Sequence, residues 1–370
     1  MDALTTLSNW QRVRLGDIFF ITAGGDLSKP HYSNTKQSDF NYPIYSNAID
    51  KKGLYGYSSF FIIKNKSITI TARGTMGVAF FRDYPYVPIG RLLVLQPKIS
   101  NIDCRFYAEY INSKVKFNTE QTTIPQLTIP KVALCEILLP PLNEQIAIAN
   151  VLSDVDHYLY SLDALILKKE SVKKALSFEL LSQRKRLKGF NQNWQRVRLG
   201  DICEIVKGQQ INKISLNNTD KYPVINGGID FLGYTNKFNV SKNTIAISEG
   251  GTCGYVRFMT SDFWSGGHNY SLQKISNKVN NLCLYHILKS YEKDIMKLGV
   301  GSGLKNIQLK ALKDFEILLP PLNEQIAIAN ILSALDSEII SLKNKKRQFE
   351  NIKKALNHDL MSAKIRVLKK

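Results

Sequence analysis

The chain has 370 residues, 44% of them hydrophobic and 22% charged, which is the composition of an ordinary globular protein with two or three hydrophobic cores. Its 50 Lys and Arg residues against 31 Asp and Glu residues give a formal net charge of +19. The five cysteines form no CxxC pair and no apolar run reaches about 18 residues, so we expect neither a metal site nor a membrane span.

The basic charge is spread over both globular regions of the chain and is not confined to a tail. An evenly basic body favours a surface that binds a polyanion. A generally basic proteome or a need for solubility is the alternative explanation. The first ten residues lack the charged and apolar regions of a signal peptide, so we expect a cytoplasmic protein.

Two segments of the chain occur twice. NWQRVRLGDI stands at 9–18 and 193–202, and LPPLNEQIAIAN stands at 139–150 and 319–330. Between these repeats the halves share only short anchors, so one scaffold carries loops of different sequence. We therefore predict an internal duplication of α+β class, with β-rich domains at 1–141 and 189–321, each followed by a long helix, at 142–188 and 322–370.

Both globular domains are expected to be mostly β, because their short β-branched or aromatic segments are bounded by Gly, Pro, Asn and Asp. In the first domain the predicted strands are 60–63, 67–71, 78–81, 91–95 and 137–141, with a helix at 105–113. In the second domain the predicted strands are 244–248, 255–258 and 317–321, with a helical segment at 282–297.

A long helix follows each domain at once. Two prolines end the closing strand, Asn143 and Asn323 are suited to cap the helices, and Glu144 and Glu324 fall in the positively polarised first turn. Apolar residues then recur in steps of three and four, as in a coiled coil. They are Ile148, Leu152, Val155, Leu159, Leu162, Ile166, Leu176 and Leu180, and in the second helix Ile328, Leu332, Leu335, Ile339, Leu342, Phe349, Leu356 and Leu360.

Each helix would run for about 40 residues, or roughly 60 Å, without an internal Gly or Pro. Lys169 and Lys173 interrupt the first stripe, and Lys346 and Lys353 the second, so the middle of the seam is weaker. Equivalent helices after equivalent domains would run antiparallel and hold the domains a fixed distance apart. The alternative is that each helix packs only on its own domain.

No catalytic signature is found. The chain has no P-loop, and its LPPL segments differ from the Asn/Asp-Pro-Pro-aromatic tetrapeptide of amino-methyltransferases. The glycine-rich run at 299–303 lacks the context of a nucleotide loop, and its counterpart around 119–123 has no glycine, so we interpret it as a flexible loop near a ligand backbone. The histidines show no metal-ligand spacing; they are His31, His157, His268, His286 and His358.

Loop residues favour nucleic-acid binding. The sequences GTMG at 74–77 and GTCG at 251–254 follow strand patterns and permit close approach of the backbone to a phosphate, although a tight turn with solvent-facing neighbours is the alternative. Arg73 corresponds to Glu249 or Gly250, and such a change suits the recognition of different bases, since Arg fits guanine and Glu fits cytosine.

Other candidates lie in a polar, aromatic loop around Asn47 and Tyr55, which is matched around Asn226 and Gly227, and in the pair 305–306, which is matched by 125–126. The aromatic residues could instead belong to the core. The predicted DNA-binding set is Asn47, Lys51, Lys52, Tyr57, Arg73, Gly74, Thr75, Gly77, Asn226, Gly228, Tyr234, Glu249, Gly251, Thr252, Gly254, Arg257, Lys305 and Asn306.

The tandem organisation, the LPPLNEQ segments, the NWQRVRLGDI starts and the GTxG loops together resemble the specificity subunit of type I restriction-modification enzymes. The segments at 122–127 and 302–307 also look like that family. The resemblance covers the whole chain, as two target-recognition domains alternating with two helical spacers. It implies a non-catalytic subunit in which each domain binds one half of a split, asymmetric DNA target and the helices fix the gap.

The resemblance also implies partners. Methyltransferase subunits carrying S-adenosylmethionine would dock on the helices and methylate adenine, and a restriction subunit using ATP and Mg would join that core. The expected docking residues are Leu142, Asn143, Gln145, Ile146, Leu322, Asn323, Gln325 and Ile326. A coiled-coil adaptor with non-specific DNA binding is the alternative function, but it would not need two divergent basic domains.

Overall fold

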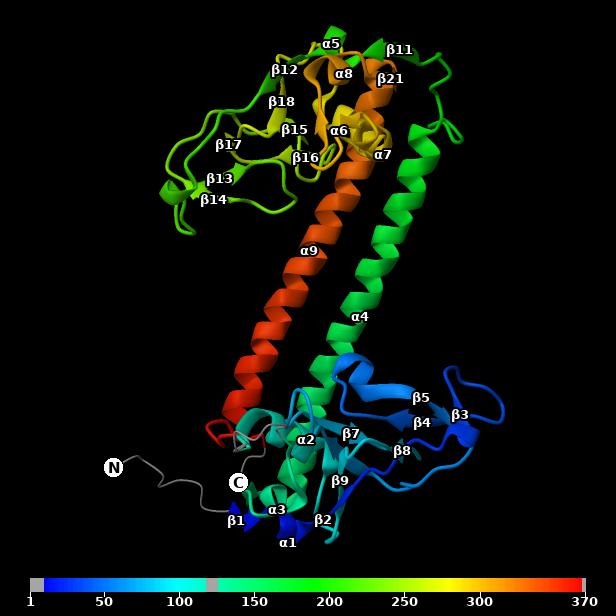
Figure 1. Ribbon diagram of the computed structural model, residues 1–370, viewed down its shortest axis with the longest axis vertical. Coiled ribbons are helices and arrows are strands. Elements are labelled where there is room, and N and C mark those ends of the chain that lie inside the picture. Colours follow the sequence, from blue (N-terminus) through cyan, green and yellow to red (C-terminus); the bar gives the residue numbers. More distant parts are fainter. Residues whose placement is uncertain (1–9, 118–125, 368–370) are drawn as a thin grey trace. The chain divides into compact units, whose positions relative to one another are not determined.

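The computed structural model describes residues 10–117 and 126–367, and its contacts divide the chain into two compact units. The first unit comprises residues 1–162 and 345–370, and the second comprises residues 163–344. Two long helices are the most extended elements, α4 (Leu142–Leu181) and α9 (Leu322–Leu360), and Figure 1 labels both. The predicted segment around 119–123, residue 125 and part of the 122–127 segment lie outside the described residues.

The first unit is built on a four-stranded antiparallel sheet in the order β2 (Phe19–Ala23), β9 (Leu93–Pro97), β6 (Ser67–Ile70) and β7 (Ala79–Arg82). A smaller sheet has the order β3 (Tyr32–Ser33), β5 (Leu54–Ser58), β4 (Tyr42–Tyr45) and β8 (Val87–Pro88). The entry strand β1 (Gln11–Arg14) pairs with the closing strand β10 (Glu136–Leu139). Its shorter helices are α1 (Leu15–Ile18), α2 (Cys104–Lys114) and α3 (Ile129–Ala133).

The second unit repeats this plan. Its main sheet has the order β12 (Glu204–Lys207), β18 (Asn269–Gln273), β15 (Thr244–Ser248) and β16 (Val256–Met259). The remaining strands are β13 (Tyr222–Ile225) between β14 (Gly233–Thr235) and β17 (Trp264–Ser265), the pair β11 (Gln195–Arg198) and β21 (Glu316–Leu319), and the pair β19 (Gly299–Val300) and β20 (Asn306–Ile307). Its helices are α5 (Leu199–Ile202), α6 (Asn281–Ser290), α7 (Glu292–Met296) and α8 (Leu309–Lys313).

The ladder registers show which residues of the two units are equivalent. Ile68 pairs with Leu95 in the first unit as Ile245 pairs with Leu272 in the second. The main-sheet strands therefore correspond in the order β2 with β12, β6 with β15, β7 with β16 and β9 with β18. This correspondence rests on backbone pairing and does not depend on side-chain similarity, so it also aligns the loops where the sequences diverge.

The core of each unit includes the start of one long helix and the end of the other. In the first unit Ile148 and Leu152 of α4 and Leu360 of α9 pack with the sheet residues, and in the second unit Ile328 of α9 and Leu181 of α4 do so. By length and composition, α9 includes a window apolar enough to cross a membrane. Of that window 28% is buried inside the structure, and Ile328, in an early turn of α9, packs in the core of the second unit.

The helices pair in an antiparallel manner within each unit. In the first unit the rings of Tyr158 and Phe349 lie 4.5 Å apart and Lys353 contacts Asp156 at 2.8 Å. In the second unit Lys169 contacts Glu338 at 2.7 Å, and Lys173 forms an ion pair with Asp336. Of the lysines that interrupt the predicted stripes, Lys169, Lys173 and Lys353 contact acidic residues of the opposite helix. Lys346 contacts Glu350 of its own helix at 3.6 Å. The helices therefore pack on each other as well as on their own domains.

Three predicted features were wrong. Residues 60–63 form no strand; their aromatic rings instead pack at the surface, Phe61 against Tyr42 and Phe60 against His31. The segment 282–297 is broken at Tyr291, whose ring packs on Phe315. The N-caps predicted for the long helices were the third, although the helices do begin at residues 142 and 322.

Asn143 and Asn323 are therefore not N-caps. Each lies inside the first helical turn, because α4 begins at Leu142 and α9 at Leu322. The backbone N–H of Gln145 donates to the carbonyl of Pro141, and that of Gln325 to the carbonyl of Pro321. The proline before each helix therefore occupies the cap position, and its carbonyl accepts the first helical hydrogen bond.

A buried carboxylate joins three chain segments in each unit. In the second unit Glu324 accepts from the indole N–H of Trp194 at 3.0 Å and from the Arg186 guanidinium at 2.7 and 2.8 Å. In the first unit Glu144 accepts from Trp10 at 3.1 Å, and Arg366 lies 2.7 Å from it. The acid begins one helix, the arginine follows the end of the other, and the tryptophan precedes the entry strand.

We predict that Glu324→Gln lowers the free energy of unfolding of the second unit by about 3 kcal/mol, because it leaves a partly buried guanidinium without its counter-charge. Hydrogen exchange of the first turns of α9 and thermal unfolding would measure this. Glu316→Gln is the matched control, since Glu316 contacts Arg196 at 3.0 Å in an exposed ion pair and should cost less than about 1 kcal/mol. Equal losses from the two variants would contradict the assignment.

Candidate nucleic-acid interface

The GTxG loops join two neighbouring strands of each main sheet and have the same geometry. Gly74 and Gly77 have φ of 66° and 85°, and Gly251 and Gly254 have φ of 69° and 83°. The second glycine of each loop donates its N–H back across the loop at 2.8 Å, to Thr71 or to Ser248.

The second glycine of each loop is required both by conformation and by space. Besides its positive φ, a Cβ at Gly77 would lie 2.8 Å from the Phe117 ring, and one at Gly254 would lie 2.8 Å from the Met296 backbone. At Gly74 nothing lies within 4 Å, so the tip of that loop is open to a ligand. Arg73 and Thr75 are exposed beside it.

An asparagine connects the loops in each unit. Asn47 donates to the carbonyl of Gly90 at 2.6 Å and accepts from the N–H of Ala72 at 2.7 Å. In the second unit Asn226 accepts from the N–H of His268 at 2.9 Å, and the neighbouring Gly227 accepts from Thr252 at 2.8 Å. Asn47 and Asn226 therefore link loops that leave one edge of the main sheet. We call these loops the loop cluster. It comprises residues 46–53, 71–78 and 88–92 in the first unit, and residues 226–232, 248–255 and 265–269 in the second.

Backbone hydrogen bonds show which residue of the second unit corresponds to Arg73. The N–H of Leu127 donates to Ala72, and the N–H of Ile307 donates in the same way to Glu249, both at 2.9 Å. Glu249 is thus the counterpart of Ala72, and Arg73 corresponds to Gly250. The expected exchange of an arginine for a glutamate at one base-contacting position was therefore wrong.

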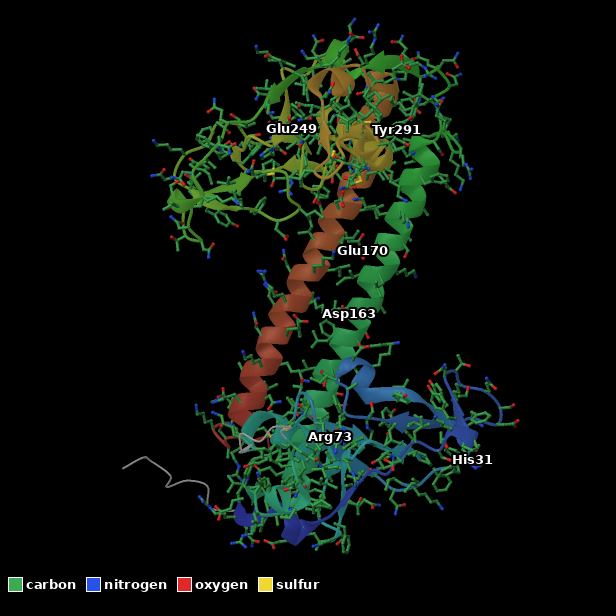
Figure 2. All side chains as sticks on the ribbon, in the orientation of Figure 1. His31, Arg73, Asp163, Glu170, Glu249 and Tyr291 are labelled. Carbon is green, nitrogen blue, oxygen red and sulfur yellow. The ribbon has the colours of Figure 1, made fainter. Side chains whose placement is uncertain are left out.

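Arg73 lies beside Gln126, and Gly250 lies beside Asn306, in the pairs 125–126 and 305–306 that the sequence analysis also selected. The Arg73 guanidinium donates to Gln126 at 3.2 Å, and a Cβ at Gly250 would lie 2.2 Å from the side chain of Asn306. Gln126 and Asn306 precede the equivalent residues Leu127 and Ile307. Figure 2 shows Arg73 in the first unit and Glu249 in the second.

In the first unit a buried arginine supports the loop that contains Lys51 and Lys52. Those lysines are exposed and have φ of 48° and 54°. The Arg82 guanidinium donates to the carbonyl of Lys52 at 2.5 Å and to Thr69 at 3.1 Å, and lies 3.6 Å from the centre of the Tyr45 ring. Sequence reasoning missed Arg82, because nothing in the segment FFR indicates that its charge is buried.

Arg257 performs the same task in the second unit. It donates to the carbonyls of Gly228 and Ile229, and its guanidinium lies 5.5 Å from the centre of the Phe231 ring. Burial lowers the pKa of Arg257 below the ordinary arginine value. Arg257 belongs to the predicted DNA-binding set, and in the structure its donors are engaged by the loop that it supports.

Tyr57 and Tyr234 lie in the smaller sheets, away from the Asn47 and Asn226 contacts. Tyr57 is half-buried in β5 opposite Ser33 and Pro43, and Tyr234 is half-buried in β14 beside Phe231. Lys305 is exposed at the end of the β19–β20 hairpin. Most of the predicted DNA-binding residues therefore lie in the connected loops, whereas Tyr57 and Tyr234 lie outside them in the smaller sheets.

Glu249 is the centre of a polar group specific to the second unit. It is 8% exposed, and its carboxylate accepts from Lys207 at 2.7 Å and from the Tyr270 hydroxyl at 3.2 Å. Burial, with the neighbouring Glu249 carboxylate, raises the pKa of Tyr270 to about 12. His268 lies 3.8 Å away.

The residues expected to dock partners divide by exposure. Asn143, Ile146, Leu322, Asn323 and Ile326 are exposed on the first turns of the helices, whereas Leu142 is half-buried. Gln145 and Gln325 are buried within their own units, which removes them from any docking surface.

Both glutamines have internal hydrogen-bond partners. Gln145 donates to the carbonyl of Pro140 at 2.8 Å and accepts from the N–H of Asp103 at 2.9 Å. Gln325 does the same with Pro320 at 2.7 Å and with Asn280 at 2.7 Å. They attach the N-terminus of a domain helix to the start of a long helix.

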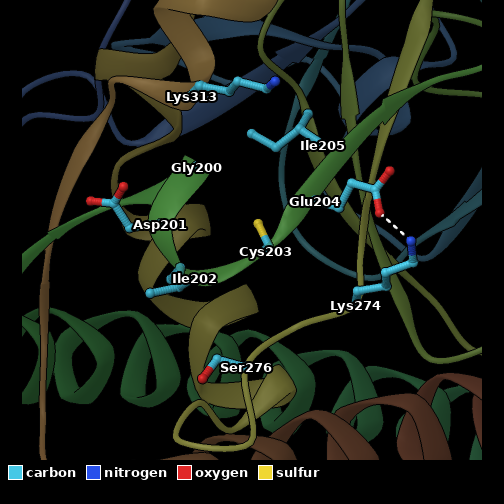
Figure 3. A pocket seen from close by; sticks show the side chains of 9 residues that line it. All are labelled: Gly200, Asp201, Ile202, Cys203, Glu204, Ile205, Lys274, Ser276 and Lys313. Carbon is cyan, nitrogen blue, oxygen red and sulfur yellow. Dashed lines mark ion pairs between the residues drawn. The ribbon is translucent and has the colours of Figure 1, made fainter.

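A hollow of about 400 Å³ lies beside α5 (Figure 3). Cys203 lines it at the position where the first unit has Phe19, whose ring packs edge-on to Tyr107 at 5.5 Å. Its charged residues are at the surface, and Lys274 is paired with Glu204 at 2.7 Å. In the described part of the chain, no group of three or more His, Cys, Asp or Glu residues could hold a metal ion.

A family model described as the type I restriction modification DNA specificity domain matches this chain at residues 7–169 and 191–351. The specificity subunit of the type I restriction enzyme MjaVIII of Methanocaldococcus jannaschii is 25% identical over 412 aligned residues, which cover 99% of this chain and 95% of the relative. A Mycoplasma pneumoniae protein named as a type I specificity subunit is 40% identical over 151 residues, and that match spans only 40% of either protein.

The fold is also similar to a solved structure. The crystal structure of the S subunit of a type I restriction-modification system from M. genitalium has a TM-score of 0.75 to this chain, with 21% sequence identity and coverage of 97% of this chain and 98% of that one. At this level of identity the likeness shows that the two proteins share a fold.

Proposed function

This chain belongs to the type I restriction-modification DNA specificity family, and from that membership we propose that it is the DNA-binding specificity subunit of such a system. Each unit would bind one half of a split, asymmetric target through its loop cluster. The observation that carries the proposal is the shared loop geometry of the two units, in which asparagine-linked loops at equivalent positions present different side chains. A common frame with different loops suits two different half-sites.

The long helices would set the gap between the half-sites and dock the other subunits. Their continuous lengths of 40 and 39 residues support the first role. Exposed apolar residues on their first turns, Ile146 and Ile326, support the second. The proposed partners are methyltransferase subunits, which would supply S-adenosylmethionine and methylate adenine, and a restriction subunit that would use ATP and Mg.

The chain itself would be non-catalytic and cytoplasmic. Three buried carboxylates of the described residues accept hydrogen bonds from structural partners. Glu144 and Glu324 each accept from a tryptophan and pair with an arginine, and Glu249 accepts from a lysine and a tyrosine. No step of DNA methylation or cleavage is assigned to any of them.

We predict that adenine-methylation mapping of DNA from cells expressing the chain with its methyltransferase subunit reveals a split motif, with a methylated adenine in each half. The motif should disappear when the chain is omitted. If the methyltransferase is folded and bound to the chain and no motif is found, the specificity function is wrong, and a non-specific adaptor becomes the better description.

We further predict that removing residues 163–166 and 343–346 shortens the gap of that motif by about two base pairs, since four residues correspond to about 6 Å of helix and base pairs rise by about 3.4 Å. Replacing the same eight residues by alanine keeps the helix length and is the control. A gap unchanged by the deletion, in a variant that still methylates, would show that the helices do not set the spacing.

A further inference from the structure

We propose that one backbone position, occupied by Arg91 in the first unit and His268 in the second, supplies a base-distinguishing contact in each half of the target. This inference rests on the proposed function and deepens it. The two residues are equivalent, because Leu93 of β9 and Tyr270 of β18 occupy the same register in their sheets and each candidate lies two residues earlier.

The loop around Arg91 is held in a backbone conformation that an arginine rarely adopts. Gly90 and Arg91 have φ of 65° and 67°. The N–H of Gly90 donates to Gly25 at 2.7 Å, and the N–H of Arg91 donates to Gly24 at 3.1 Å. A left-handed conformation at a non-glycine residue persists only where neighbouring bonds impose it, and such residues concentrate at functional sites.

The loop is also fixed by close packing and by the asparagine. A Cβ at Gly24 would lie 2.7 Å from the carbonyl carbon of Pro88, so β2 continues directly under the loop. Asn47 donates to the carbonyl of Gly90, the residue before Arg91, at 2.6 Å. In the second unit a Cβ at Gly208 would lie 2.1 Å from the carbonyl oxygen of Gly266. The base of the side chain at this position is therefore rigid in both units.

The Arg91 side chain itself is exposed, and it makes no hydrogen bond, ion pair or ring contact with any residue that the structure describes. Two other arginines near the loop cluster are engaged, Arg73 by Gln126 and Arg82 of β7 by Lys52 and Thr69. A planar guanidinium on a rigid backbone, with its donors free, suits two parallel hydrogen bonds to the O6 and N7 atoms of guanine.

His268 is held by other backbone partners than Arg91, without a left-handed φ, and it has different neighbours. Its N–H donates to Asn226 at 2.9 Å, and its carbonyl accepts from the N–H of Glu249 at 3.0 Å. Around it stand Lys207, Glu249 and Tyr270, where the first unit has Ala23, Ala72 and Leu93. The side chain and its surroundings thus change together between the units.

This difference distinguishes a base contact from a phosphate contact. The phosphate backbone is the same in both halves of any target, so a phosphate-binding position should keep a cation in both units. Here the first unit has a free arginine, whereas the second has a histidine 3.8 Å from a carboxylate that would repel a phosphate. A position that contacts bases is expected to vary in this way.

The test is selection of binding sites from a random duplex DNA library by the purified full-length chain, with the variants Arg91→Gly, Arg91→Gln and His268→Ala. Both Arg91 variants should reduce the preference at one base pair of one half-site by roughly tenfold to a hundredfold. His268→Ala should change the other half-site only. Because glycine accepts the left-handed conformation freely, Arg91→Gly should not lower the melting temperature, which separates lost recognition from lost folding.

Arg12→Gln is the control, since Arg12 is an exposed arginine of the same unit on β1, and its loss changes the net charge equally. It should leave both half-sites unchanged. Uniform weakening on all sequences by the Arg91 variants would make Arg91 a phosphate contact, and an unchanged motif would remove it from the interface; either result overturns the inference. If the unsubstituted chain selects no motif, the proposed function itself fails.

Discussion

The buried carboxylate at the start of each long helix is the interaction on which the rest of the structure depends. Glu144 and Glu324 stand in a helical first turn, where the free backbone N–H groups favour negative charge, and each also receives a tryptophan and an arginine. The tryptophan precedes the domain's entry strand and the arginine follows the opposite helix. In each unit, segments far apart in the chain therefore meet at one acid.

A shared frame of this kind allows the loops to diverge. The sheet registers and the GTxG glycines are common to both units, so the loops leave the sheet at equivalent places. An asparagine just after β4 or β13 bonds to a neighbouring loop in each unit, although Asn47 and Asn226 occupy different positions of the frame. The two units differ in what fills those places: Arg82 and Arg257 support the same loop from different strand positions, and a polar group around Glu249 replaces small and apolar residues. Stability and recognition are thus assigned to different residues of one fold.

Much of this architecture could be predicted from the sequence, because repeats, strand patterns and a seam with a helical period are local properties. What failed depended on tertiary contacts. Gln145 and Gln325 look like surface residues of a repeated motif, yet their side-chain amides form hydrogen bonds inside the unit. The equivalence of Arg73 with Gly250 required the hydrogen bonds of Leu127 and Ile307. Arg91 was missed because its left-handed backbone and free guanidinium have no signature in sequence.

The central claim is that two units of one frame recognise different half-sites through their loops. The most direct measurement is adenine-methylation mapping for a chain in which residues 199–319 are replaced by residues 15–139, so that both units present the first set of loops. The account predicts an inverted-repeat motif made of two copies of the first half-site. Retention of the original asymmetric motif by this chain would contradict it.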